Sequence, residues 1–365
     1  MNHHLFMQRA LALAVKAKGR TSPNPMVGAV VVKDGKIVGE GYHHQAGAPH
    51  AEVLALQEAG TKAQGSTLYV TLEPCCHFGK TPPCVEKIIQ SGVREVIGAV
   101  ADPNTLVNGQ GYELLKAAGI KVQVGVLRQE AEQLNEVFFK YIRTKKPFVT
   151  LKWAMTLDGK IATVNNDSKW VSNEKSRALV HQWRDSTDAL VVGVNTILND
   201  NPFLTTRLPH GRGKDPWRII LDTHLRTPVE ANVLNTASKA PTIICCGPEA
   251  DEIKKNNLAA QGVQIWELPI QGGTLDLNYL LESLGKQELT SILVEGGGKV
   301  LESFFRLGLA DKVCCFIAPK ILGGEAAKTP VEGEGIKLMS QAYKLTRVSH
   351  ESIGEDLLIT GYLRR

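Results

Sequence analysis

The chain has 365 residues, of which 43% are hydrophobic and 22% are charged, and its formal net charge is +5. This length suits two or three globular domains with sizeable cores, and no apolar run approaches the roughly 20 residues of a membrane helix. The mild positive charge is spread along the chain, which favours an ordinary solvated surface over a nucleic-acid groove and also suits anionic phosphate ligands.

The first 145 residues predict alternating helices and strands. The N-terminal segment is an amphipathic helix that ends near Gly19; Gln8 and Arg9 interrupt its apolar residues, so it is not a signal peptide. MVGAVVVKDGKIVGEGY predicts a β-hairpin that turns at Asp34-Gly35. The later elements expected are helix 48–60, strand 66–74, helix 82–92, strand 94–103, helix 111–119, strand 120–127 and helix 131–143. Such alternation predicts a sheet covered on both faces.

A basic turn before Pro147 separates the two halves of the chain. We expect a boundary near 144–147, which gives domains 1–145 and 146–365. The second half predicts strand 148–155, then helix 173–184 behind a cap at Ser172-Asn173, and strands at 188–194, 217–222, 241–246, 263–268, 290–295 and 312–318. No internal repeat links the halves, so we expect two different α/β domains.

The chain has seven cysteines, and six of them form adjacent pairs, at 75–76, 245–246 and 314–315. Neighbouring residues of a strand point to opposite faces, so a pair within a strand is a poor framework for disulfides. The second and third pairs lie in expected strands and are interpreted as small core residues. Without a signal peptide, a reducing, cytoplasmic location is expected.

The first cysteine pair lies in EPCCHFGKTPPC, residues 73–84. Together with His50, the thiolates of Cys75 and Cys84 would make a three-ligand zinc site with a fourth position for water, whose pKa zinc lowers to roughly 7. Glu52 is two residues from His50 and is suited to move protons without ligating the metal. These residues match the zinc-deaminase pattern H-x-E followed by P-C and a second cysteine.

The spacing of the cysteines departs from that pattern, because eight residues separate Cys75 from Cys84 instead of two. The extra loop carries His77 and Lys80, which suit a substrate phosphate. Other interpretations are a capping histidine with inert cysteines, or a closed structural zinc site that uses Cys76 or His77. A structural site has no use for a glutamate beside a ligand, and Cys75 is favoured over Cys76 because it directly follows the proline of the motif.

The motifs TSPNPMVGAVVV (21–32), HAE (50–52), TLEPCCHFGKTPPC (71–84) and ADPN (101–104) resemble the deaminase half of the bifunctional riboflavin-biosynthesis deaminase/reductase family. KWAMTLDGKIA (152–162), VGVNTILNDNPFLTTR (192–207) and VEGGGKVLESFF (294–305) resemble its reductase half. The resemblance implies a cytidine-deaminase-like α/β/α domain followed by a dihydrofolate-reductase-like α/β domain. It also implies zinc and NADPH as cofactors and a homo-oligomer, dimer or tetramer. Serine is more familiar than cysteine at position 76, so Cys76 is a departure that leaves a thiol open to oxidation.

The two implied reactions are hydrolytic deamination of 2,5-diamino-6-ribosylamino-4(3H)-pyrimidinone 5′-phosphate and reduction of the product's ribosyl chain by NADPH. The resemblance makes His50, Cys75 and Cys84 zinc ligands and Glu52 the proton shuttle. For the deaminase substrate, it implies Asn24, His77, Lys80 and Asn104; for the reductase substrate, it implies Ser168, Arg184, Leu204, Arg207 and Glu295. For NADPH, it implies Ala154, Trp170, Thr196, Asp200, Thr223, Gly297, Gly298, Lys299, Val300, Leu301, Glu302 and Ser303.

Taken alone, several of these residues also have ordinary interpretations. A glycine run before a helix lets backbone N–H groups approach a pyrophosphate, but it is as often only a tight turn. Trp170 alone would be a core residue, Asp200 a turn former and Arg184 a surface charge. No general acid is evident in the reductase half. The alternatives for the whole chain are an RNA or nucleotide deaminase with an accessory nucleotide-binding domain, and a structural zinc module joined to a nucleotide-binding regulator.

Overall fold

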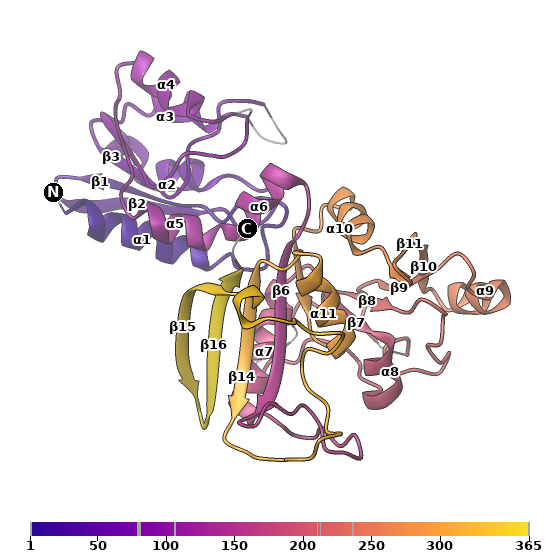
Figure 1. Ribbon diagram of the computed structural model, residues 1–365. Helices are drawn as coiled ribbons and strands as arrows, with labels where there is room; N and C mark the ends of the chain where they lie inside the picture. The colour runs from indigo at the N-terminus through magenta and orange to yellow at the C-terminus, as the bar shows by residue number, and fades with distance from the viewer. Residues whose placement is uncertain are drawn as a thin grey trace. The chain divides into compact units, whose positions relative to one another are not determined.

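The computed structural model describes residues 2–78, 82–105, 107–209, 211, 213–235 and 237–363 (Figure 1). The chain divides into two compact units, Met1–Lys146 and Pro147–Arg365, and each is described by itself. None of the helices in the described ranges combines the length and apolar character needed to cross a bilayer.

The N-terminal unit is built on a five-stranded sheet in the order β2-β1-β3-β4-β5. The hairpin of β1 and β2 is antiparallel, β1 is also antiparallel to β3, and β3, β4 and β5 run parallel. The strands are β1 (Gly28–Lys33), β2 (Lys36–Tyr42), β3 (Thr67–Val70), β4 (Glu95–Gly98) and β5 (Lys121–Val124). The helices are α1 (His3–Val15), α2 (Ala51–Ala59), α3 (Cys84–Gln90), α4 (Gln110–Ala117), α5 (Arg128–Leu134) and α6 (Glu136–Thr144), with a 3-10 turn at Gly60–Ala63.

Glycines in the hairpin let helices pack closely on both faces of this sheet. A Cβ atom at Gly28 would collide with the backbone of Ala10 in α1, and one at Gly41 would collide with the backbone of Ala51 in α2. Gly41 pairs with Ala29, the neighbour of Gly28, so these two glycines point to opposite faces. The sheet is therefore covered on both sides, as the alternation of elements predicts.

The single helix predicted at 131–143 is wrong, because Asn135 divides it into α5 and α6. The Asn135 side chain is buried; its Oδ1 accepts from the Met26 backbone N–H at 2.8 Å, and its Nδ2 donates to the Met26 carbonyl at 2.9 Å. These hydrogen bonds to a distant backbone segment occur where the sequence predicted an unbroken helix.

The C-terminal unit has a nine-stranded sheet in the order β10-β9-β8-β7-β13-β6-β14-β16-β15 (Figure 1). The strands from β10 to β14 run parallel, and β16 and β15 add an antiparallel edge. They are β6 (Phe148–Thr156), β7 (Ala189–Gly193), β8 (Trp217–Leu221), β9 (Thr242–Cys246), β10 (Gln264–Glu267), β13 (Ser291–Val294), β14 (Lys312–Ala318), β15 (Leu345–Ile353) and β16 (Asp356–Leu363). The helices are α7 (Glu174–Ser186), α8 (Val194–Asp200), α9 (Glu252–Ala260), α10 (Leu277–Lys286) and α11 (Gly298–Arg306); a small hairpin, β11 (Ile270–Gln271) and β12 (Thr274–Leu275), and a 3-10 turn at Met339–Gln341 complete the unit.

Alternate residues of the central strands enter different cores. Cys245 belongs to the hydrophobic cluster that includes Phe304 of α11, whereas Cys246 belongs to the cluster on the other face, with Ile197 of α8. The predicted strands around both later cysteine pairs are confirmed, and none of the seven cysteines forms a disulfide. The sequence prediction contains neither β15 nor β16; most side chains of β15 are exposed, which leaves little hydrophobic signal there.

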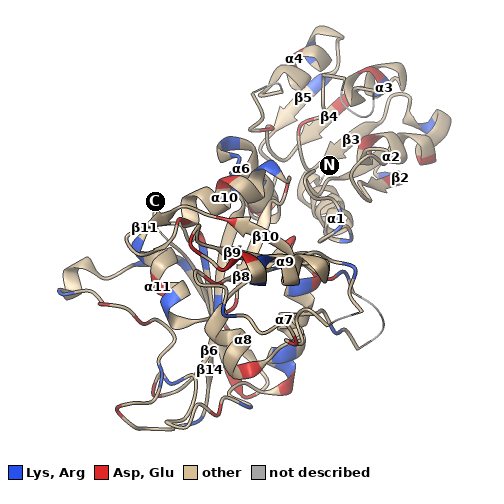
Figure 2. Ribbon diagram, turned by 90° about the vertical axis from the view of Figure 1, so that its right-hand side faces the viewer, with Lys and Arg blue, Asp and Glu red and all other residues tan. Residues whose placement is uncertain are grey.

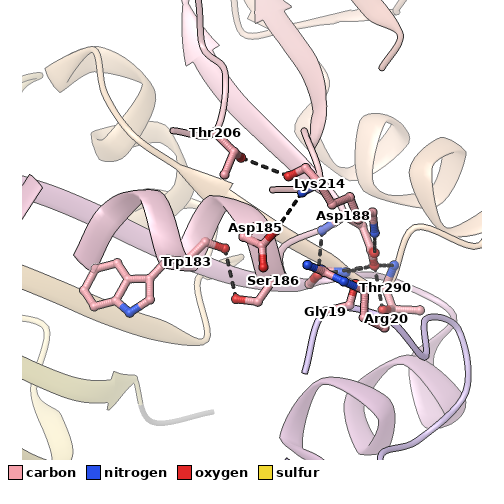
Figure 3. Close-up of polar contacts among 10 residues, drawn as sticks. Gly19, Arg20, Trp183, Asp185, Ser186, Asp188, Thr206, Lys214 and Thr290 are labelled. Atoms are coloured by element: carbon pink, nitrogen blue, oxygen red, sulfur yellow. Dashed lines mark hydrogen bonds and ion pairs between the residues drawn. The ribbon is translucent and has the colours of Figure 1, made fainter. Parts of the chain in front are cut away.

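A buried carboxylate joins the beginnings of two neighbouring strands in the C-terminal unit (Figure 3). Asp188, just before β7, accepts hydrogen bonds from the backbone N–H and hydroxyl of Thr290 at 2.9 and 2.8 Å, and from Ser291 at 3.2 Å. Lys214 lies 3.3 Å from the second Asp188 oxygen and donates its backbone N–H to Asp185. These bonds hold β7 in register beside β13.

Elsewhere, basic and acidic residues are interleaved along both units (Figure 2).

Candidate active sites

Three side chains of the N-terminal unit converge where two helices begin. His50 is the N-cap of α2, Cys84 is the first residue of α3, and Cys75 lies in the loop after β3. The Nδ1 atom of His50 is 3.1 Å from Cys84 Sγ and 3.5 Å from Cys75 Sγ, and all three donor atoms lie within 4.8 Å of one another. Neither Cys76 nor His77 belongs to this group. A closed structural zinc site would require one of them as the fourth ligand.

The donor set fits a zinc ion. Ligands held 2.0–2.3 Å from one tetrahedral centre lie about 3.5–3.8 Å apart, close to the separations of these three atoms. Hydrogen bonds from the Cys84 thiol and from His50 lower the pKa of Cys75 below its ordinary value, against the opposing effect of burial. A lowered pKa favours the thiolate, the form that binds metal.

Glu52 lies in the first turn of α2 with only 3% of its surface exposed. Burial raises the pKa of its carboxyl to about 7, and the charge of His50 opposes that rise. A buried carboxyl with such a pKa can both accept and release a proton near neutral pH. Glu52 thus stands beside the three metal-type ligands in the protonation range that acid–base work requires.

The residues predicted to hold the deaminase substrate have different surroundings. Asn24 contacts the His43 ring through Nδ2 at 3.1 Å, and Asn104 donates its backbone N–H to Asp102 at 2.8 Å. The Nδ1 atom of His77 is buried without a hydrogen-bond partner among the described residues. Lys80 lies outside the described residues. Burial raises the pKa of Asp102 to about 6, and the nearby His77 opposes this rise.

Glu73, the glutamate of EPC, has a role that sequence reasoning missed. Its buried carboxylate accepts backbone N–H bonds from Asp102 and Gly109 at 3.0 and 2.9 Å through Oε2, and from Gly111 at 2.9 Å through Oε1. Glu73 therefore ties the start of the segment that carries Asn104 to the beginning of α4. Its place directly before Pro74 and the metal-type cysteine is the only local signal.

The C-terminal unit contains a cavity of about 730 Å³ at the carboxyl ends of its parallel strands. Segments after β7, β8 and β13 contribute to its wall, together with residues of β6 and α7. Because β13 enters the sheet between β7 and β6, this is a point where the direction of chain winding changes, and ligands of open α/β sheets bind at such points. Its volume lies in the range of ligand pockets.

A buried ion pair is part of the wall of this cavity. Arg184 of α7 donates from Nε and Nη2 to the two oxygens of Glu295, each at 2.7 Å, and from Nη1 to the Thr205 carbonyl at 3.0 Å. The side chains are 13% and 7% exposed. Burial acts to raise the pKa of Glu295, but the charge and hydrogen bonds of Arg184 outweigh it and hold that pKa below its usual value.

Most residues predicted for the reductase half line this one cavity. They are Ala154, Ser168, Trp170, Arg184, Thr196, Asp200, Arg207, Thr223, Glu295, Gly297, Gly298, Lys299, Val300 and Leu301. Leu204 does not line it, because its side chain is buried in the neighbouring hydrophobic cluster. Glu302 and Ser303 also lie off its wall; Glu302 pairs with Arg306 at 3.0 Å instead.

Sequence reasoning missed several polar residues of the cavity wall, among them Lys152, His181, His224 and Arg226. Lys152 lies within the strand motif KWAMTLDGK, and its place in that motif was the only sequence signal for it. His181 receives the backbone N–H of Arg207 at its Nδ1, 3.2 Å away, and burial lowers its pKa to about 4. These residues come from separate elements, so no spacing along the chain joins them.

The glycine run after β13 fits a dinucleotide phosphate. Gly296 and Gly297 have φ values of 148° and 82°, and α11 begins at Gly298 beside the cavity. Because Gly298 has no Cβ atom, it leaves room for the Glu332 side chain, whose Cγ would lie 2.5 Å from such an atom. Free N–H groups at the start of a helix attract phosphate, which agrees with the NADPH expectation.

Comparison with known proteins finds relatives of both units. The family model for the cytidine and deoxycytidylate deaminase zinc-binding region matches residues 1–100, and that for the RibD C-terminal domain matches residues 147–359. Riboflavin biosynthesis protein RibD of Aquifex aeolicus is 49% identical over 97% of this chain and 96% of its own length; that of Escherichia coli K12 is 40% identical over 89% and 90%.

Solved structures agree over the whole chain. Acinetobacter baumannii RibD, form 1, has a TM-score of 0.88 at 35% identity and covers 100% of this chain and 99% of its own. The Thermotoga maritima diaminohydroxyphosphoribosylaminopyrimidine deaminase/5-amino-6-(5-phosphoribosylamino)uracil reductase has a TM-score of 0.85 at 38% identity and covers 99% of each chain. The expected fold classes are confirmed, and so are zinc and NADPH as the cofactors. The chain belongs to the RibD family of bifunctional riboflavin-biosynthesis deaminase/reductases.

Proposed function

We propose that this chain carries out the two reactions that name its Thermotoga maritima relative: deamination of the diamino-pyrimidine ribose phosphate and reduction of the resulting amino-uracil compound. The N-terminal unit would hold the first activity and the C-terminal unit the second. The observation that carries the proposal is the convergence of His50, Cys75 and Cys84 within 4.8 Å, next to buried Glu52.

In the deaminase, His50, Cys75 and Cys84 would hold zinc, which when bound supplies Lewis-acid activation of water. Glu52 takes a proton from the attacking water at its carboxylate and returns it to the departing amino nitrogen. A C–O bond then forms at C2 of the pyrimidine, the C–N bond breaks, and ammonia leaves. The pKa of about 7 that burial gives Glu52 suits both transfers.

Substrate recognition would come from side chains around this centre. Asn24 and Asn104 are proposed from the sequence motifs to contact the pyrimidine edge, and the buried Nδ1 of His77 has no hydrogen-bond partner among the described residues and could bind a ligand. Lys80 is proposed from the sequence motif to bind the phosphate. These residues position the ring, and Glu52 carries the chemistry.

In the reductase, NADPH when bound supplies the hydride that converts the ribosyl chain to ribityl. Arg184 locks Glu295 in one orientation, so the remaining lone pairs of that carboxylate can receive ring N–H groups of the pyrimidine. Arg207, beside neutral His181, is placed for the substrate phosphate, and Ser168 donates its hydroxyl to Asp200 at 3.4 Å. The glycine run and residues around it would hold the cofactor.

The test uses the purified full chain with zinc, the diamino-pyrimidine ribose phosphate and NADPH. Ammonia release followed by NADPH oxidation is expected. Glu52→Gln should abolish ammonia release while zinc content, measured by plasma emission spectroscopy, stays the same. Deamination by Glu52→Gln at the parental rate would refute the assigned role of Glu52.

The homo-oligomer also belongs to this proposal. Ile321, Leu338 and Met339 between β14 and β15 are 74%, 60% and 88% exposed, and apolar groups left on a surface suit contact with a second copy. Light scattering should therefore give a dimer or tetramer mass; a monomer at micromolar concentration would contradict it. A cytoplasmic location stays a prediction that cell fractionation can check.

A further inference from the structure

One end of the reductase cavity is cationic. His224 and Arg226 follow β8, and they line the cavity together with Thr223 and with Asn195 of α8. Arg226 donates from Nη2 to Asn195 Oδ1 at 3.1 Å, which orients the guanidinium. Its side chain is still 50% exposed, so other donor atoms of the guanidinium remain accessible to a ligand.

The acidic residue that directly follows β8 is turned away from this end of the cavity. Asp222 is fully buried and does not line the wall. Its Oδ2 accepts from the backbone N–H and hydroxyl of Thr227 at 2.7 and 2.8 Å, and its Oδ1 is 4.0 Å from Arg226 Nε. In dinucleotide sites an acidic side chain near the ribose accepts the 2′-hydroxyl of NAD, whereas an arginine accommodates the 2′-phosphate of NADP.

The other acidic residues on the wall, Asp200, Glu295 and Glu332, come from segments elsewhere in the chain.

In the sheet, β7 alone separates β8 from β13, whose end carries the glycine run. Two strand spacings are about 10 Å, a distance that a ribose next to a pyrophosphate can bridge. A cofactor with its pyrophosphate at Gly297 can therefore reach Arg226 with its adenosine ribose.

We propose that His224 and Arg226 form the subsite for the 2′-phosphate of the cofactor and set the preference of this chain for NADPH over NADH. The proposal rests on the reductase function proposed above. Arg226 would form charge-assisted hydrogen bonds to the phosphate, and Asn195 is the positioning residue that holds the guanidinium in place.

The first test measures binding without catalysis. Calorimetry compares adenosine 2′,5′-bisphosphate with ADP as probes on the full chain, the Arg226→Ala and His224→Ala variants, and the control Arg128→Ala, which removes an exposed arginine of α5. Because Arg226→Ala removes charge-assisted hydrogen bonds to the 2′-phosphate, it should weaken binding of the bisphosphate about 10- to 100-fold. ADP binding should stay within about twofold, and Arg128→Ala should change neither probe.

The second test measures kcat/KM with each nicotinamide cofactor and the deaminated pyrimidine. Arg226→Ala should lower kcat/KM for NADPH by the same 10- to 100-fold factor and leave that for NADH unchanged, while Arg226→Lys should fall between. Equal losses with both cofactors, or an unmodified chain that binds the bisphosphate no more tightly than ADP, would overturn the proposal. A chain that binds the bisphosphate through Arg226 but oxidises no NADPH would count against the proposed reaction and not against the subsite.

Discussion

Glu73 shows how much a single side chain can organise at the deaminase centre. It is adjacent in sequence to the cysteine motif, yet its carboxylate contacts the backbone 29 to 38 residues later, at Asp102, Gly109 and Gly111. Both oxygens are used, and each backbone N–H would be left without its acceptor if the carboxylate were removed. Glu73 is therefore a positioning residue for the segment that carries Asn104.

We expect Glu73→Gln to raise KM for the pyrimidine substrate about tenfold, with a smaller fall in kcat. The side-chain amide of glutamine would place an NH2 group opposite a backbone N–H that now has a carboxylate acceptor. Leaving that N–H without an acceptor costs roughly 1–3 kcal/mol of stability. Steady-state ammonia release measures both constants. Glu113→Gln, an exposed glutamate of α4, is the matched control and should change neither. A fall in kcat with KM unchanged would argue against a positioning role.

The Arg184–Glu295 pair makes a second prediction at this scale. Arg184→Lys keeps the charge but loses the two parallel hydrogen bonds, so reductase kcat/KM should fall more than about tenfold while ammonia release is unchanged. Arg184→Ala leaves a buried carboxylate unpaired and should destabilise the C-terminal unit by about 3–5 kcal/mol in urea unfolding. Arg347→Lys, an exposed arginine of β15, should alter neither measurement.

The pH dependence of this pair has a definite sign. The folded state holds the pKa of Glu295 below its ordinary value of 4.5. The pair therefore stabilises the fold above pH 4.5, and that stabilisation is lost as the pH falls through the lower, folded-state pKa. As the pH falls through this acidic range, the free energy of unfolding should decrease less for Arg184→Ala than for the parent chain. Urea unfolding at a series of pH values measures the difference.

At the scale of elements, the junction between α5 and α6 depends on Asn135. We expect Asn135→Ala to lower the free energy of unfolding by about 2 kcal/mol, because the N–H and carbonyl of Met26 would lose their partners. Thermal unfolding followed by circular dichroism measures the change. Gln133→Ala, exposed on α5, should shift stability by no more than about 0.5 kcal/mol. A stable Asn135→Ala variant with one continuous helix would contradict this account.

Elements with strong local patterns could be predicted, and elements defined by distant partners could not. The valine-rich hairpin at 28–42 and the buried parallel strands have short apolar runs bounded by turn residues, and the structure confirms them. Strand β15 and the break at Asn135 have no such pattern. Their conformations come from pairing with β16 and from contact with Met26, respectively.

At the scale of the whole molecule, the two proposed activities need different cofactors. Removal of zinc with dipicolinate should abolish ammonia release, whereas NADPH oxidation on the deaminated substrate should stay within about twofold of its starting rate. Added zinc should restore deamination. Loss of both activities on chelation would contradict the assignment of zinc to the His50, Cys75 and Cys84 group.

The sequence by itself determined the residue types proposed to carry chemistry and their order along the chain. HAE, EPC and the glycine run could be recognised because these proposed site residues lie at helix starts and strand ends, where local turn signals place them. Only the tertiary structure decided which side chains meet. Glu73 reaches Gly111, Arg184 reaches Glu295, and the cations after β8 share a cavity with Gly297. The physical reason is that such contacts depend on sheet order and helix packing, which join residues that no spacing along the chain connects.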